Sequence, residues 1–166
     1  MEPKLKSYLE KNKISYMEHK HLAVFTVEEA KKIKDKLPTF FHTKNLFLKD
    51  EDKNYFLVCM DAYKKLDIKI LKQELEAKKK LSFCSPEILK EKLNLTPGSV
   101  SIFGMINASP GSVKLIIDKE VWDAEKVGFH PNINTATLEL THENLKKFVE
   151  TLENEYMIID LPSKDR

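Results

Sequence analysis

The stretch GFHPNINT (Gly128–Thr135) is the part of the chain around which the remainder is organised. It precedes an alternating segment, 135–140, that predicts a strand. Glycine adopts backbone angles that other residues avoid, and proline fixes its own φ angle. Since His130, Asn132 and Asn134 add hydrogen-bonding groups, we expect a rigid loop that forms a binding site, with the other elements as its frame.

Length and composition predict one domain over residues 1–161, followed by a polar tail at 162–166. The formal net charge of +2 is too small for a global polyelectrolyte field, so nucleic-acid binding would need local basic patches. Cys59 and Cys84 lie in apolar segments, which is typical of reduced, buried thiols. Met1–Lys13 lacks the apolar core of a signal peptide, and no apolar run approaches the roughly twenty residues of a membrane span. We therefore expect a cytoplasmic protein.

Helices and strands mix without strict alternation. Helices are predicted at 3–13, 26–36, 66–75, 85–93 and after Thr141, and strands at 14–18, 43–49, 55–60, 81–83, 113–118, 135–140 and 156–161. Leu66, Ile70 and Leu71 are expected to point inward, and residues 100–107 to be semi-extended. Short turns give antiparallel pairs and helical connections allow parallel ones, which predicts an α+β fold with a mixed, curved, partly barrel-like sheet surrounded by helices.

Several catalytic motifs are missing: a glycine-rich phosphate loop, a G-x-S-x-G turn and paired CxxC motifs. His19 and His21, with His130 or His142, would form a metal site only by accident of folding, so exposed loop histidines are the preferred interpretation. Cys84 and His130 could act as a thiol nucleophile and its base, although a core cysteine is the better interpretation. We expect neither a metal nor a cofactor.

Lys44 stands between Thr43 and Asn45 at the start of an apolar strand. A strand-end lysine is most often solvated. The alternative is a cation held at the sheet edge, where it meets a phosphate or a carbonyl group.

Five segments, in order, resemble the YbaK-like, prolyl-tRNA synthetase-associated editing domains. They are Thr43–Leu48 (TKNLFL), Leu81–Glu87, Leu95–Ser101 (LTPGSVS), Phe103–Asn107 (FGMIN) and Val127–Thr137, which contains GFHPN and NTAT. Ile102 and Ala108 depart from the pattern, at positions where relatives often carry proline and aspartate. The similarity is greatest to the free-standing branch of the family, the alanyl-tRNA(Pro) deacylases.

The resemblance implies a trans-editing hydrolase that clears alanine from tRNA(Pro) by attack of a positioned water on the aminoacyl ester. Lys44, assisted by Asn45, would hold the terminal adenosine or its phosphate. Gly128, His130 and Pro131 would form the loop against the aminoacyl group; whether His130 acts chemically or only positions water is left open.

The resemblance also suggests residues around the substrate. Gly104 and Asn107 would line the opposite wall, Val27 and Phe129 would select a small side chain, and Asn132 would contact the substrate. The tRNA-binding candidates are Lys31, Lys32, Lys78, Lys79 and Lys80. The implied partners are the tRNA(Pro) acceptor end and prolyl-tRNA synthetase.

Two alternatives remain at this point. The domain could bind aminoacyl-tRNA or a synthetase without turnover, or it could clear another amino acid, such as cysteine from tRNA(Pro). The oligomeric state, and whether the chain is free-standing or part of a synthetase, are open.

Overall fold

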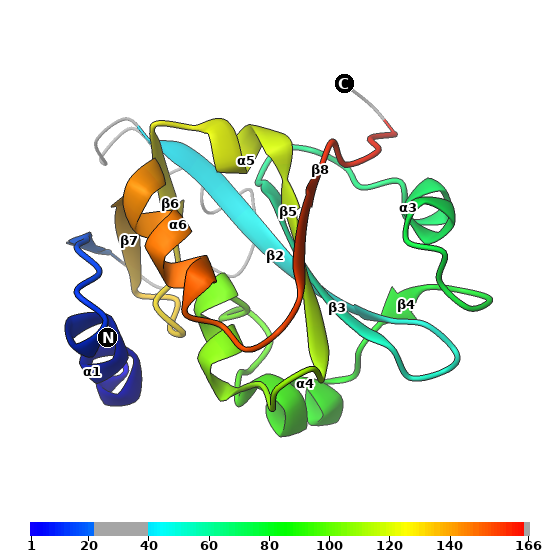
Figure 1. Cartoon of the computed structure of the whole chain (residues 1–166), viewed down its shortest axis with the longest axis horizontal. Helices are drawn as coiled ribbons and strands as arrows, with labels where there is room; N and C mark the ends of the chain where they lie inside the picture. Colours follow the sequence, from blue (N-terminus) through cyan, green and yellow to red (C-terminus); the bar gives the residue numbers. More distant parts are fainter. Residues whose placement is uncertain (22–39, 165–166) are drawn as a thin grey trace.

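The computed structural model describes residues 1–21 and 40–164 (Figure 1). The predicted helix at 26–36, with Val27, Lys31 and Lys32, lies outside these residues. The helices are α1 (Pro3–Lys11), α3 (Ile68–Glu74), α4 (Pro86–Leu93), the 3-10 helix η1 (Ile102–Asn107), α5 (Lys119–Asp123) and α6 (His142–Glu150).

Local sequence explains where the helices begin. The Ser85 side chain accepts a hydrogen bond from the Ile88 N–H at the start of α4, and Pro86 takes the first helical position, where no N–H is needed. Thr141 caps α6 in the same way, through the Asn144 N–H. These two predicted starts are confirmed.

Eight strands form one mixed sheet in the order β1-β7-β6-β2-β3-β5-β8, with the short β4 paired to β2. The strands are β1 (Met17–Lys20), β2 (Phe41–Lys49), β3 (Tyr55–Asp61), β4 (Ser82–Phe83), β5 (Val113–Asp118), β6 (Lys126–Phe129), β7 (Ala136–Thr141) and β8 (Tyr156–Ile159). β2 and β3 form the predicted antiparallel hairpin, whereas β6 runs parallel to β2, and β5 parallel to β3 and β8. The predicted α+β class is confirmed, and the strand path, which runs from β1 to β8, does not close into a barrel within the part of the chain described.

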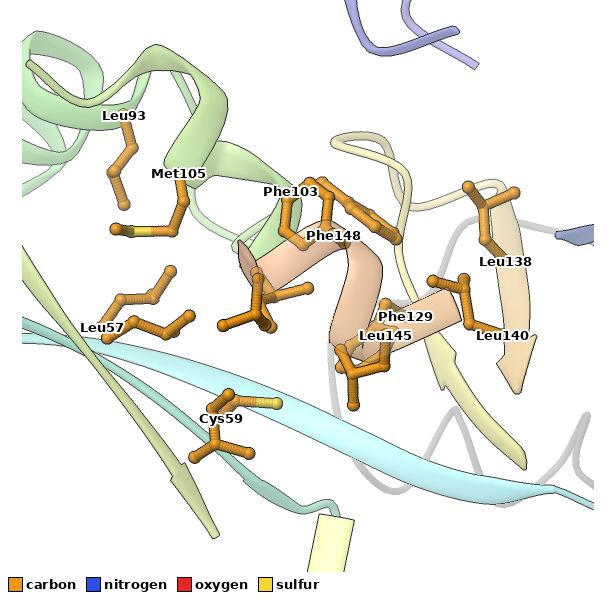
Figure 2. Close-up of a cluster of buried hydrophobic side chains, with 14 of the residues drawn as sticks. Leu57, Cys59, Leu93, Phe103, Met105, Phe129, Leu138, Leu140, Leu145 and Phe148 are labelled. Atoms are coloured by element: carbon orange, nitrogen blue, oxygen red, sulfur yellow. The ribbon is translucent and has the colours of Figure 1, made fainter. Parts of the chain in front are cut away.

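Alternation along β3 separates two hydrophobic clusters on opposite faces of the sheet. Leu57 and Cys59 point to the first face, into a core formed with α1, α4, η1, α5 and α6. Val58 and Met60 point to the second face, where they meet α3. Figure 2 shows the first-face cluster, in which Phe103 contacts the rings of Phe129 at 5.7 Å and Phe148 at 5.1 Å between centroids. Burial of each such side chain stabilises the fold by about 1.5–3 kcal/mol.

The structure corrects four local predictions. Ile70 is 43% exposed, because α3 turns only Leu71 fully inward. Residues 102–107 form η1 instead of an extended segment, since the Ser101 hydroxyl accepts from the Phe103 N–H and starts a turn. His19 and Lys20 belong to β1 and not to a loop, because β1 pairs with β7. Gly128 and Phe129 likewise belong to β6, so the expected loop begins only at His130.

The predicted polar tail makes backbone contacts. The Asp67 N–H donates to Pro162 and the Lys164 N–H donates to Lys65, at 2.9 and 3.0 Å. None of the helices in residues 1–21 and 40–164 is long and apolar enough to cross a membrane.

Candidate functional site

Polar side chains gather on the second face of the sheet in the half formed by β1, β7, β6 and β2. His42 pairs with Gly128, and Gly128 pairs with Glu139, so these three residues share a side. Lys44 joins them, because it lies two residues beyond His42 on the same strand. The same register adds His19 and Thr137. Since the first face of this half is apolar, the polar second face is the candidate site.

Lys44 is a partly buried cation with no ion pair inside the described ranges. It pairs with Met60 across the β2–β3 hairpin. Burial lowers the pKa of its ammonium group, and the nearby carboxylate of Asp61 partly opposes this shift. A cation that has lost part of its hydration is well suited to receive an anionic ligand. The alternative of a fully solvated strand-end lysine does not describe this residue.

His130 follows directly after β6, two residues beyond Gly128, and Gly128 pairs with His42, two residues before Lys44. Its Nδ1 lies 3.1 Å from the Ala136 carbonyl oxygen. A carbonyl oxygen only accepts, so Nδ1 donates, and in the neutral ring Nε2 is left as an acceptor. Burial lowers the pKa of His130; the hydrogen bond to Ala136 opposes this, and nearby His21 lowers the pKa further. The ring is therefore held neutral and can accept a hydrogen bond from water or a hydroxyl.

The edge of β2 beside Lys44 has no strand partner among the described residues. β6 pairs with β2 only at Phe41 and His42, and β4 only at Leu48 and Lys49. Between these segments, residues 44–46 have no strand partner on that side within the chain as described. Because buried backbone groups require hydrogen-bonding partners, this gap offers polar backbone atoms to a ligand.

Asn132, two residues after His130, is a buried side chain with unsatisfied polar atoms in the described structure. It is 7% exposed, and neither its Nδ2 nor its Oδ1 has a hydrogen-bond partner within the described structure. Its φ of +62° is left-handed, a conformation that asparagine tolerates better than most residues. An unpaired buried amide costs about 1–3 kcal/mol. An amide that can both donate and accept is thus available to a ligand.

Gly128 allows an aromatic ring to lie against the sheet. A Cβ atom there would stand 2.2 Å from the Phe40 ring and 2.9 Å from Cγ2 of Thr137. Phe40 stacks on His42 at 4.6 Å and on His19 at 5.7 Å between ring centroids. The glycine therefore has a packing role beneath the site.

Other predicted substrate contacts lie away from Lys44. Phe129 is buried in the first-face core (Figure 2). A Cβ on Gly104 would stand 2.5 Å from Leu95 Cδ1, and Asn107 donates to the Leu93 carbonyl, so both join η1 to α4. Asn45 points to the face opposite Lys44 because neighbouring strand residues alternate, although its buried Oδ1 has no partner in the described structure. Pro131 is buried beside His130.

The three predicted lysines of the turn after α3 have separate environments. Lys78 lines a polar pocket beside Asp50, whose carboxylate accepts from the Lys78 N–H. Lys79 pairs with Glu51 at 3.8 Å, and Lys80 lines a different, apolar groove. Adjacent positions in the sequence therefore serve different surfaces.

The metal and thiol hypotheses gain no support from the geometry. His19 contacts Glu139 at 3.2 Å and His21 contacts Thr137 at 2.9 Å, but no cluster of three metal-binding side chains occurs in residues 1–21 and 40–164. Burial raises the pKa of the Cys84 thiol to about 11, with Lys49 opposing the shift. A thiol protonated at neutral pH is a poor nucleophile.

Sequence reasoning missed Phe40, His42 and Glu139 as members of this face. Glu139 is buried and contacts both His19 and, at 3.9 Å, Lys126. Polar and apolar residues alternate in β7, which indicates that Glu139 and Thr137 share a polar face. Which other residues share that face depends on the partner strands.

Comparisons with known proteins agree with this architecture. The sequence profile described as "Aminoacyl-tRNA editing domain" matches residues 21–148. The chain is 38% identical to "Prolyl-tRNA editing protein ProX" of Acetoanaerobium sticklandii, over 92% of this chain and 93% of that protein. It is 30% identical to "Prolyl-tRNA synthetase associated domain-containing protein 1" of Danio rerio, over 93% and 84%.

A solved structure shares the fold. The crystal structure of a protein proposed to be a trans-editing enzyme for prolyl tRNA synthetase aligns with a TM-score of 0.74 at 16% identity, over 98% of this chain and 99% of that one. The matching profile spans most of the sheet and the face that carries Lys44 and His130. The chain therefore belongs to the aminoacyl-tRNA editing domain family.

Proposed function

We propose that this protein is a trans-editing deacylase that hydrolyses the ester of mischarged tRNA, with Ala-tRNA(Pro) as its main substrate. The observation that carries the proposal is Lys44, a partly buried cation without an ion pair in the described structure, on the strand that pairs with the one leading to the neutral His130. Membership of the editing family and 38% identity to ProX support the reaction class.

The chemical need for such an enzyme is a matter of size. A synthetase pocket built for proline loses only about 1–3 kcal/mol of binding with a smaller apolar amino acid. A second site that admits alanine and excludes proline supplies the missing discrimination.

The reaction replaces one acyl–oxygen bond by another. A water oxygen attacks the ester carbonyl carbon, the bond to the terminal ribose oxygen breaks, and that oxygen takes a proton. In our proposal Lys44 binds a phosphate of the terminal nucleotide, and His130 Nε2 accepts a hydrogen bond from the attacking water or a ribose hydroxyl. Rate acceleration then comes from positioning and from polarisation of the carbonyl by N–H donors of the Gly128–Asn132 segment.

Asn132 and Phe40 complete the proposed site. The Asn132 amide can bind the aminoacyl group because its donor and its acceptor are both unused in the described structure. Phe40 forms an apolar floor between His19 and His42. We further propose the tRNA(Pro) acceptor end and prolyl-tRNA synthetase as partners, and the cytoplasm, where tRNA is charged, as the location.

The decisive experiment measures deacylation of Ala-tRNA(Pro), Pro-tRNA(Pro) and Cys-tRNA(Pro) by the wild type, Lys44→Ala and a control, Lys147→Ala, on the exposed side of α6. We expect rapid loss of alanine only, at least about a hundredfold slower in Lys44→Ala and unchanged in Lys147→Ala. Hydrolysis of Cys-tRNA(Pro) in place of Ala-tRNA(Pro) would keep the deacylase and change its proposed substrate. Binding of tRNA without hydrolysis of any of the three would overturn the enzyme and favour the binding module.

A further inference from the structure

Residues of α3, of β4 and of the segment before β4 line a groove. In Figure 1, α3 and β4 lie at the end of the molecule opposite α1. The volume of the groove is about 460 Å³. Its apolar lining residues are Ile68, Leu81 and Phe83, with Ser82 beside them. Its lining also includes four cations, Lys69, Lys72, Lys80 and Lys164. We refer to it as the lysine-rimmed groove.

Within the described residues, no acidic side chain compensates the charge of this groove. No carboxylate lines it, and none of its four lysines forms an ion pair within residues 1–21 and 40–164. Elsewhere on the surface, by contrast, Lys79 pairs with Glu51 and Lys114 with Glu155. On a chain with a net charge of only +2, four lysines that have no ion pair in the described structure form a local positive patch that complements a polyanion.

Phe83 gives the groove a second binding element. Its side chain is 58% exposed, although it lies in a strand paired to β2. An exposed aromatic ring beside several cations is the arrangement that binds single-stranded nucleic acid, where a base stacks on the ring and lysines contact the phosphates.

The groove is connected to the candidate active site through β2. Phe83 pairs with Leu48, so it lies on the same face as Lys44. Leu48 lies four positions along the strand from Lys44, which is about 13 Å at roughly 3.3 Å per residue. The part of the β2 edge at residues 44–46, which has no strand partner in the part of the chain described, lies along this path. A ligand whose reacting end is at Lys44 can therefore continue along this edge to the groove.

We infer that the lysine-rimmed groove binds the unpaired 3′ segment of an RNA substrate, with one base stacked on Phe83 and the adjoining phosphates on the lysines. The inference rests on the proposed function, since it takes the substrate to be aminoacyl-RNA. It adds a surface, formed by α3, β4 and Lys164, that the reacting end does not occupy. An acidic protein segment is the competing occupant. RNA is favoured because the groove and Lys44 share one face and one strand edge.

The test uses uncharged RNA, so that binding is measured without turnover. A hairpin with an unpaired 3′ tail and a matched blunt hairpin are titrated by fluorescence anisotropy against the wild type, Phe83→Leu, Phe83→Trp and a Lys72→Ala/Lys80→Ala double variant. Lys147→Ala is the control for loss of an exposed lysine. Phe83 and the lysines are surface side chains, and circular dichroism checks that each variant is folded.

We expect Phe83→Leu to bind the tailed hairpin about tenfold more weakly and Phe83→Trp to restore binding, because stacking needs a ring. The double lysine variant should lower the slope of log Kd against log salt by about 0.7 for each phosphate that the protein no longer neutralises. Binding of the blunt hairpin should not change. With Ala-tRNA(Pro), the same variants should raise KM with little effect on kcat, whereas alanyl-adenosine, which lacks the RNA segment, should be hydrolysed as by the wild type.

Unchanged binding of the tailed hairpin in Phe83→Leu and in the lysine variant would overturn the inference. An oligoglutamate peptide is titrated in the same way. If the Phe83 and lysine variants bind this peptide more weakly but bind the tailed hairpin as the wild type does, the inference is overturned and the groove binds an acidic protein segment. If wild type binds the tail through the groove but hydrolyses no aminoacyl ester, the groove inference stands and the proposed function fails.

Discussion

The Nδ1 atom of His130 lies 3.1 Å from the carbonyl oxygen of Ala136, and this contact determines which ring nitrogen can serve a substrate. Nδ1 is occupied as a donor, and Nε2 is the acceptor when the ring is neutral. The burial that keeps the ring neutral gives activity and stability a defined dependence on pH.

The first prediction concerns pH. The pKa of His130 is below its ordinary value, so the unfolded chain binds this proton more readily than the folded protein does. The stability that neutral His130 contributes is therefore complete above the ordinary histidine pKa of about 6.5 and decreases as pH falls through the lowered value. The free energy of unfolding, from urea titrations across this range, should depend less on pH in His130→Gln. The acidic limb of kcat/KM should flatten in the same variant, and an unchanged limb would remove His130 from the mechanism.

The second prediction separates function from stability at Lys44. Lys44→Met removes the charge and keeps the aliphatic chain, so kcat/KM should fall by at least about a hundredfold. Because a partly buried cation is lost, the free energy of unfolding should stay within about 1 kcal/mol of the wild type or rise. Steady-state kinetics measures kcat/KM, and denaturant unfolding of the same preparation measures the free energy of unfolding. A parallel loss of activity and stability would assign Lys44 a structural role.

The third prediction compares two glycines. Gly128→Ala should destabilise the fold by about 1–3 kcal/mol, because the new methyl group meets the Phe40 ring at 2.2 Å. Gly104→Ala should cost less, because the atom it meets, Leu95 Cδ1, is the end of a flexible side chain. Thermal unfolding of the two variants shows which glycine substitution is more destabilising. Adding Phe40→Leu should recover part of the stability lost in Gly128→Ala and none of that lost in Gly104→Ala.

The fourth prediction concerns Asn132. Asn132→Gly keeps the left-handed backbone and removes an amide that has no partner in the described structure, so stability should change by less than about 1 kcal/mol. Deacylation should slow by about tenfold or more if this amide binds the aminoacyl group. Asn94→Gly is the matched control, since Asn94 has a φ of +55° at the end of α4. Equal activity in both variants would exclude Asn132 from the site.

The fifth prediction concerns the ion pair of Lys64 and Asp118, whose Nζ and Oδ2 atoms lie 3.0 Å apart and are almost fully buried. Asp118 also accepts from the Leu161 N–H. Asp118→Ala leaves a buried, unpaired ammonium group and should cost about 3–5 kcal/mol. The double variant Lys64→Met/Asp118→Leu should recover a large part of that loss in denaturant unfolding, and no recovery would mean that the Leu161 contact dominates.

Local signals were sufficient for much of the fold. Ser85 with Pro86, and Thr141, predicted the starts of α4 and α6 because a cap is a short-range interaction. The β2–β3 hairpin followed from two apolar runs around a polar turn. η1 was missed because its apolar residues carry no helical period long enough to detect, and its first turn depends on one hydroxyl, that of Ser101.

The candidate site was harder, because a face exists only once strands are paired. Lys44 and the His130 segment were identified from their sequence, but Asn45 was assigned to the same site although alternation places it on the other face. Phe129, next to His130, belongs to the core for the same reason. The sequence could not place His42 and Glu139 on one face, since nearly a hundred residues separate them. Their common neighbour in the sheet is Gly128, which pairs with His42 on one side and with Glu139 on the other.

The pairing of β1 with β7 has a consequence for synthesis on the ribosome. Met17 pairs with Glu139, so the first strand made must wait for one of the last before its backbone is paired. Contacts between such distant positions form slowly, because the entropy cost of closing a long loop comes before any stabilising contact is made. β1 adds His19 to the polar face, and β7 adds Glu139 and the Ala136 carbonyl that orients His130. The nascent chain therefore completes this polar face, the candidate site, only when translation is nearly finished, whereas the β2–β3 hairpin can form much earlier.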